Sequence, residues 1–234
     1  MALAYLELRE GIIHTCLEMN RLGINQGTSG NVSARTPEGF LITPSGVPYD
    51  RMQPEQIVAM DLDGGYWGES LPSSEWRMHQ DIYRERAEAQ AVVHTHSTYA
   101  TALSCLRQGI PAFHYMVSVA GGADLRCSSY ATFATAELSD AMLAALHQRS
   151  ACLLANHGMI CFGENLAKAL WRAGEVEALA KQYFIARQLG EPVILDDAEM
   201  QRVLRRFKTY GQQAKATTGA EADAIEAPVR RDAA

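Results

Sequence analysis

The chain has 234 residues, of which 47% are apolar and 21% charged, and its formal net charge is −6. This length and composition suit one globular domain with a substantial core. The negative charge, without any cluster of Lys or Arg, argues against nucleic acid and against an anionic membrane surface as partners.

The helical and strand periodicities alternate along the chain, without internal repeats. They predict, in order, a helix over 3–22, strands over 32–35, 40–43 and 57–62, a helix over 74–86, a strand over 91–96, and helices over 98–106, 135–148 and 165–189. No linker divides this series, and several strands are close enough in sequence to form hairpins. The pattern predicts a single α/β domain with antiparallel pairing in its sheet.

The two ends of this domain differ. The first predicted helix is followed by Gly23, which is well placed to end it in a left-handed conformation. From about Gly211 the chain is rich in Ala, Glu, Asp and Thr and lacks apolar periodicity. We therefore expect a folded domain over 1–212 and a disordered tail over 213–234.

The cysteines are odd in number and widely spaced, at Cys16, Cys105, Cys127, Cys152 and Cys161. Such a set is typical of reduced thiols rather than of a disulfide framework. No apolar run approaches the roughly 18 residues that a membrane span requires. We expect a cytoplasmic protein.

The most informative motif is the His-x-His formed by His94 and His96 directly after the apolar run 91–93. Alternate residues of a strand point to the same face, so the two imidazoles can bind one ion. His157 ends a similar run, 153–156, and a third imidazole from another strand would complete the nitrogen set of a catalytic zinc site. The alternative is that these are ordinary buried or surface histidines.

Glu75 lies about twenty residues before this pair, in the first turn of its predicted helix, where Ser74 is the expected N-cap. Its carboxylate can reach a metal at the end of the next strand. It can equally be an acid stabilised by the helix dipole, and position alone favours that second interpretation. His79 follows one turn later and is expected to be structural.

Three loops rich in small residues offer hydroxyls and exposed N–H groups, which suit phosphate. They are 27–31 (Gly-Thr-Ser-Gly-Asn), 43–46 (Thr-Pro-Ser-Gly) and the Ser73-Ser74 pair at a helix start. Each is a weak signal alone, and no nucleotide-binding glycine motif is present. Their meaning depends on whether they converge in space.

Together these motifs resemble the class II aldolase/adducin family. The resemblance runs in order from about residue 8 to the segment 207–211, through 26–33 (QGTSGNVS), 42–46 (ITPSG), 71–76 (LPSSEW), 93–96 (VHTH), 110–116 (IPAFHYM) and 156–158 (NHG). It implies a three-layer α/β/α domain around a mostly antiparallel sheet, and a homotetramer with active sites at subunit interfaces. The expected partner is a small sugar phosphate.

The resemblance also implies a role for each matching residue. His94, His96 and His157 would bind one Zn²⁺ per subunit. Glu75 would be the fourth ligand and, once substrate displaces it, the catalytic acid/base. Tyr115 would handle the aldehyde-side proton in a neighbouring subunit. Phosphate would be held by Thr28, Gly30, Asn31, Ser45, Gly46, Ser73 and Ser74, with Phe133 and Tyr210 at the aldehyde side.

The implied reaction is reversible cleavage of a ketose 1-phosphate to dihydroxyacetone phosphate and an aldehyde. L-Fuculose 1-phosphate and a 5-deoxy- or 5-methylthio-pentulose 1-phosphate are the candidate substrates. A sugar-phosphate 4-epimerase of the same family is the first alternative, but such enzymes typically carry Asp where Glu75 stands and an acid near 115–117. An adducin-like interaction module is the second, but such modules lack the three histidines.

Overall fold

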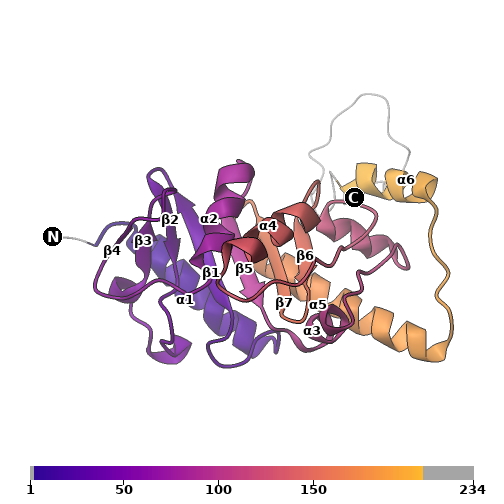
Figure 1. Ribbon diagram of the computed structural model, residues 1–234, viewed down its shortest axis with the longest axis horizontal. Helices are drawn as coiled ribbons and strands as arrows, with labels where there is room; N and C mark the ends of the chain where they lie inside the picture. The colour runs from indigo at the N-terminus through magenta and orange to yellow at the C-terminus, as the bar shows by residue number, and fades with distance from the viewer. Residues whose placement is uncertain (1–2, 208–234) are drawn as a thin grey trace, which may run out of the picture.

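The computed structural model of the chain describes residues 3–207 (Figure 1). Its helices are α1 (Leu6–Arg21), α2 (Trp76–Glu85), α3 (Thr98–Cys105), α4 (Ala136–Ala145), α5 (Leu166–Leu189) and α6 (Asp197–Phe207). Its strands are β1 (Asn31–Thr36), β2 (Gly39–Ile42), β3 (Val58–Met60), β4 (Tyr66–Trp67), β5 (Ala91–Thr95), β6 (Ala151–Leu154) and β7 (Gly158–Gly163). Three 3-10 turns accompany them, η1 (Tyr49–Arg51), η2 (Pro54–Gln56) and η3 (Tyr115–Ala120).

The seven strands form one sheet in the order β4-β3-β2-β1-β5-β7-β6, and every neighbouring pair within it is antiparallel. In the interior of the sheet, β1, β5 and β7 are consecutive neighbours that come from different thirds of the chain. Asn31 of β1 lies opposite His94 of β5, and His94 lies opposite Ile160 of β7. This register places the predicted site residues on the middle strands, away from the edges.

Helices cover both faces of the sheet, as Figure 1 shows, and the alternation of strand side chains explains why. In β5, Ala91 and Val93 belong to the core under α1, α3 and α5. Val92 belongs to the second core, under α2 and α4. Because both faces are apolar, both must be covered, which confirms the three-layer α/β/α arrangement.

Most of the elements lie where periodicity predicts them. Gly23 has a φ of 70° at the end of α1, as expected. Sequence reasoning missed β4, β7 and α6. It placed His157 at the end of the run 153–156; the strand β6 ends at Leu154, and His157 lies in the turn that joins β6 to β7. The predicted domain limit at residue 212 and the tail 213–234 lie outside the described residues.

Within the described range, none of the helices combines the length and the apolar character that crossing a membrane would require. The same part of the chain contains all five cysteines, and all of them are free thiols. Cys16, Cys152 and Cys161 are buried, whereas Cys105 is exposed.

Candidate metal centre and active site

The first two histidines come from the end of the central strand β5. His94 is fully buried on the sheet face that α2 covers, and His96 follows two residues later, just beyond the last residue of the strand. Strand alternation therefore turns both imidazoles to one side. The rings lie 4.9 Å apart between centroids, with 3.0 Å between their Nε2 atoms.

The third histidine is supplied by the turn of the β6–β7 hairpin. The turn spans residues 155–157, and Asn156 takes up a left-handed conformation there with a φ of 55°. The backbone N–H of His157 donates to the carbonyl of Leu154. Asn is among the residues that tolerate such a conformation best, so the Asn-His-Gly sequence suits this turn.

Glu75 occupies the N-cap position of α2, in place of the predicted Ser74, but its side chain does not cap its own helix. Its Oε2 lies 3.2 Å from Nε2 of His94, and its Oε1 lies 3.0 Å from Nε2 of His157. Only 6% of the residue is exposed. The carboxylate is therefore directed at the histidines, and the interpretation of Glu75 as an ordinary helix-dipole acid is wrong.

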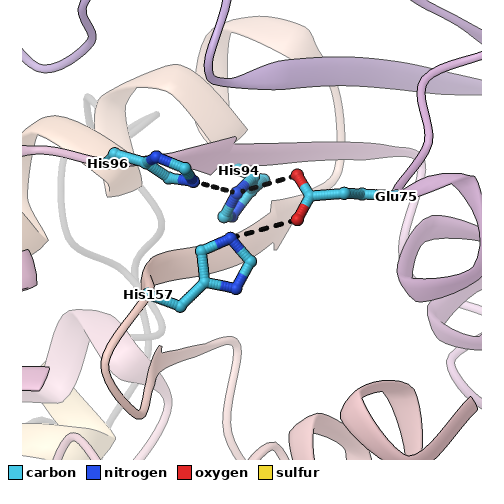
Figure 2. Close-up of side chains that lie close together, drawn as sticks. All are labelled: Glu75, His94, His96 and His157. Atoms are coloured by element: carbon cyan, nitrogen blue, oxygen red, sulfur yellow. Dashed lines mark hydrogen bonds and ion pairs between the residues drawn. The ribbon is translucent and has the colours of Figure 1, made fainter. Parts of the chain in front are cut away.

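Figure 2 shows the three imidazoles and the carboxylate converging from β5, the β6–β7 turn and the start of α2. All four candidate ligand atoms lie within 4.8 Å of one another, and the rings meet edge to face at 73–76°. Ligand atoms about 2.0–2.2 Å from one tetrahedral ion lie about 3.3 Å apart, close to the distances found here. The donor set can therefore hold a metal ion.

The hydrogen bonding around the cluster supports metal binding. Nδ1 of His94 lies 2.8 Å from the carbonyl oxygen of Met159 and donates to it, so with a metal bound Nε2 would present its lone pair to the ion. Burial, followed by the charges of His94 and His157, lowers the pKa of His96 to about 4. His96 is therefore neutral near pH 7, the form that binds a metal.

Glu75 is ionised in the same surroundings. Burial by itself would raise the pKa of its carboxyl group, but charge and hydrogen bonds from His94 and His157 outweigh burial and lower that pKa well below its usual range. A carboxylate that stays charged while 6% exposed is the form that a cation ligand or a general base needs.

The three loops predicted to hold phosphate lie side by side. The N–H of Ser45 donates to the carbonyl of Leu71, and the N–H of Ser73 donates to that of Thr43, so the second and third loops are paired. Thr28 of the first loop and Ser74 of the third share the wall of one cavity. Ser45, Gly46 and Ser74 are exposed, whereas Gly30 and Ser73 are buried.

Asn31 differs from the other predicted phosphate residues. Its side chain is buried, donates from Nδ2 to Oε2 of Glu75 at 2.9 Å and accepts from Nε2 of His79 at 2.5 Å. One of the two N–H groups of this amide thus serves the carboxylate, and the assignment of Asn31 to phosphate stays a prediction. His79 itself does not belong to the four-residue cluster, as expected.

The cavity beside the cluster has a volume of about 390 Å³ and takes in hydroxyl, carboxylate, imidazole and aromatic groups. Its walls are formed by Thr28, Ser29, Ser74, Glu75, His96, Tyr130, Ala131, Phe133, Asn156 and His157. Phe133 is where the sequence placed it, whereas Tyr130, Ala131 and Asn156 were missed. The segment 128–135 has no helical or strand periodicity, so the sequence carried no signal for the two new wall residues at 130 and 131.

Of the remaining two predicted residues, only Tyr115 lies within the described part of the chain. Tyr115 begins η3, is 46% exposed and stacks on His114 with ring centroids 4.8 Å apart. It does not line the cavity described above. Tyr210 lies outside the described residues.

Comparisons with known proteins agree with this geometry. Residues 10–184 match the family model of the Class II Aldolase and Adducin N-terminal domain. A 5-methylthioribulose-1-phosphate/5-deoxyribulose-1-phosphate aldolase of Rhodospirillum rubrum is 52% identical over 89% of this chain and 94% of its own length. An L-fuculose phosphate aldolase of Escherichia coli is 50% identical over 88% and 96%.

A solved structure of an L-fuculose 1-phosphate aldolase superposes with a TM-score of 0.85 at 41% sequence identity, covering 89% of this chain and 98% of the other. The likeness therefore covers most of the chain rather than a single motif. The chain therefore belongs to the class II aldolase and adducin family, and it is an aldolase of the class II type.

Proposed function

We propose that the chain is a zinc-dependent aldolase that cleaves a ketose 1-phosphate reversibly to dihydroxyacetone phosphate and an aldehyde. The observation that supports this most directly is the convergence of three Nε2 atoms and one carboxylate at the wall of a cavity lined by hydroxyl-bearing loops. The aldolases of R. rubrum and E. coli that resemble it carry sugar 1-phosphate or sugar phosphate substrates in their names.

Zinc suits the donor set better than magnesium or calcium. Imidazole nitrogen is a preferred ligand of zinc, whereas magnesium and calcium prefer a shell of oxygens. His94, His96, His157 and Glu75 would hold the ion. When bound there, the ion supplies the positive charge that stabilises negative charge developing on the oxygens of the substrate.

Proton transfer then falls to residues of the chain. Cleavage breaks the C3–C4 bond of the ketose, the electron pair passes to C3 and the adjoining C2 carbonyl, and the C4 hydroxyl loses its proton to become the aldehyde. The proton released by the C4 hydroxyl balances the proton that C3 gains: Glu75 takes up a proton and delivers it to C3 in this direction, and its carboxylate removes that proton in the synthetic direction. Because its carboxylate is ionised and buried, it is suited to removing a proton from carbon.

The other predicted residues complete this proposal. The phosphate is bound, and the reacting carbons are fixed beside Glu75, by Thr28, Asn31, Ser45, Gly46, Ser73 and Ser74 with the backbone around Gly30. Tyr115, which is exposed in the single chain, acts on the C4 oxygen in the site of a neighbouring subunit of a homotetramer. The five free thiols suit the reducing environment of the cytoplasm.

The aldehyde half of the substrate faces a different kind of surface. Tyr130, Ala131 and Phe133 give the cavity an apolar wall, which suits a methyl or methylthio end. The candidate substrates share the phosphate and ketone half and differ in the aldehyde half. They are L-fuculose 1-phosphate and a 5-deoxy- or 5-methylthio-pentulose 1-phosphate. We therefore place the choice between them at the aromatic wall.

The decisive experiment is a cleavage assay on these three ketose 1-phosphates, with release of dihydroxyacetone phosphate as the readout. We expect cleavage with zinc, loss of activity with a chelator and recovery when zinc is returned. An enzyme that releases no dihydroxyacetone phosphate from any of them, although it is folded and loaded with zinc, would contradict the proposal. The ranking of the three kcat/KM values identifies the preferred aldehyde.

A further inference from the structure

A row of buried polar side chains runs from Glu75 into the layer between β1 and α2. Asn31 donates to Oε2 of Glu75 at 2.9 Å, and Nε2 of His79 lies 2.5 Å from Oδ1 of Asn31. Behind them, Oγ of Ser33 lies 2.6 Å from Nδ1 of His79 and 2.7 Å from the hydroxyl of Tyr83. All four supporting residues are at most 3% exposed.

The row follows from two matching periodicities. Asn31 and Ser33 are alternate residues of β1 and face α2, because Val32 between them belongs to the opposite core. Glu75, His79 and Tyr83 are spaced by four residues and share one side of α2. A polar stripe on the strand thus meets a polar stripe on the helix, inside a layer that is otherwise apolar.

The hydrogens in this row can run in only one direction. An ionised Glu75 only accepts, so Asn31 must present its NH₂ to it and its Oδ1 to His79. Oδ1 also only accepts, so Nε2 of His79 carries the ring hydrogen and Nδ1 accepts from the Ser33 hydroxyl. The oxygen of Ser33 is then left to accept from Tyr83. Each side chain fixes the orientation of the next.

Burial keeps the imidazole in the neutral form that this direction requires. Burial, followed by the charge of His94, lowers the pKa of His79 to about 3. A charged ring would offer hydrogens at both nitrogens, and Nδ1 could then no longer accept from Ser33.

We propose that His79 is a positioning residue for proton transfer: it locks the Asn31 amide with its NH₂ toward Glu75, and so holds Oε2 of Glu75 in its reactive orientation. This inference deepens the proposed function and rests on it. Without His79 the amide is free to rotate, and its carbonyl oxygen would then face the carboxylate and repel it. The loss should fall on proton transfer rather than on binding of the phosphate.

The test compares His79→Leu with His79→Gln, whose amide N–H can again donate to Asn31. Exchange of the C3 hydrogen of dihydroxyacetone phosphate, kcat, KM and bound zinc are measured on each full-length variant. We expect His79→Leu to lower exchange and kcat by about 10-fold or more, as loss of a group that orients a ligand commonly does, with KM little changed. His79→Gln should recover most of both rates.

Gln80→Leu is the matched control, because Gln80 is equally buried on α2, next in sequence, and its Nε2 has no hydrogen-bond partner among the described residues. It should leave the rates unchanged. The inference would be overturned if His79→Leu exchanged the C3 hydrogen at the wild-type rate. It would also be overturned if His79→Gln exchanged it no faster than His79→Leu. A wild-type enzyme that exchanges no proton at all would instead overturn the proposed function.

A second measurement does not depend on activity or on whether the leucine variant folds. The ¹⁵N spectrum of the imidazoles in the zinc-loaded enzyme, with the His79 signals assigned by their loss in His79→Gln, reports which ring nitrogen carries hydrogen. We expect Nε2 of His79 to be protonated and its Nδ1 to be unprotonated. The opposite tautomer would reverse the direction of the row and refute the locking of Asn31. Tyr83→Phe, which removes only the far hydroxyl, should reduce exchange less than His79→Leu.

Discussion

The inner and outer halves of the active site are built in opposite ways. In the inner half, Glu75 and His94 are at most 6% exposed, and each is held by hydrogen bonds within the chain. In the outer half, Tyr130 and Phe133 are 54% and 64% exposed, and Tyr115, which we propose acts in a neighbouring subunit, is 46% exposed. The inner half is therefore organised before substrate arrives, whereas we expect the outer half to gain its contacts from the substrate or from another subunit.

This difference matches the chemistry that each half is proposed to perform. The phosphate and ketone carbons are common to all the candidate substrates, and rigid groups serve them well. The aldehyde end varies, and the names of the aldolases from R. rubrum and E. coli differ in that part of the sugar. Substitutions in the inner half should abolish turnover, whereas those in the outer half should change selectivity.

The largest effect is expected from breaking the inner half at its metal. His96→Ala removes one of the four donors, so we expect loss of bound zinc and of nearly all cleavage. Zinc content by elemental analysis and release of dihydroxyacetone phosphate are the measurements. His147→Ala, at an exposed histidine outside the cluster, should retain both. A zinc-free enzyme with full activity would end the metal hypothesis.

Glu75→Gln should come next. The amide keeps the shape of the side chain but cannot take up a proton from carbon, so we expect C3 exchange in dihydroxyacetone phosphate to fall about 10²-fold or more. Glu137→Gln is the matched control, because Glu137 is an exposed acid in the first turn of α4 without a role in the site. Unchanged exchange in Glu75→Gln would assign proton transfer to another residue.

Tyr115→Phe tests the outer half. We expect a loss of kcat of about ten- to a hundredfold, because only proton transfer at the C4 oxygen is affected. If Tyr115 acts in a neighbouring subunit, mixing the weak Tyr115→Phe and Glu75→Gln proteins under subunit exchange should restore activity, since some sites then combine both intact residues. An active monomer, or a mixture without recovery, would rule out the shared site.

The smallest expected effect concerns stability. The pKa of His79 is lowered to about 3 by burial and the charge of His94, against about 6.5 in an unfolded chain. Below that higher value the unfolded chain binds a proton that the fold does not, so the free energy of unfolding falls as the pH drops, by up to about 1.4 kcal/mol per pH unit. At pH values above about 6.5, His79 makes no contribution to the pH dependence of the free energy of unfolding.

Urea unfolding of the chelated wild type and of His79→Gln at several pH values measures this effect. The variant lacks the titrating ring. The difference between the free energies of unfolding of the two proteins should therefore narrow as the pH falls below the pKa of the free imidazole. Parallel curves would show that His79 titrates in the fold as it does in the unfolded chain.

Much of the fold could be predicted because its signals are local. Apolar spacing marks α1 and α5 in the sequence. The starts of α4 and α5 are marked by their N-cap residues, Thr135 and Asn165, whose side chains accept from backbone N–H groups. The strand β7 was missed because its run GMICFG lies between glycines and is too short to distinguish by periodicity. Its pairing with β5 joins residues about 65 apart, which no local pattern reports.

The site shows the same division. Strand alternation was sufficient to pair His94 with His96, but position alone favoured the wrong interpretation of Glu75, because its orientation depends on the hairpin that carries His157. Sequence reasoning did not foresee that the amide of Asn31 also contacts Glu75 and His79. The spacing of Glu75 and His79 by one helical turn predicted a structural histidine, but it did not predict the hydrogen bond between His79 and Asn31.

Gly158 has a consequence for how this centre can change. A Cβ at this position would lie 2.5 Å from the carbonyl oxygen of Thr95 and 3.0 Å from Cδ2 of His96. The backbone at Gly158, next to His157, thus packs directly on the backbone at Thr95, next to His96. No side chain lies between these two ligand-bearing segments. The distance between these two segments, and with it the spacing of His96 and His157, is therefore set by the backbone and leaves no room for a side chain at residue 158.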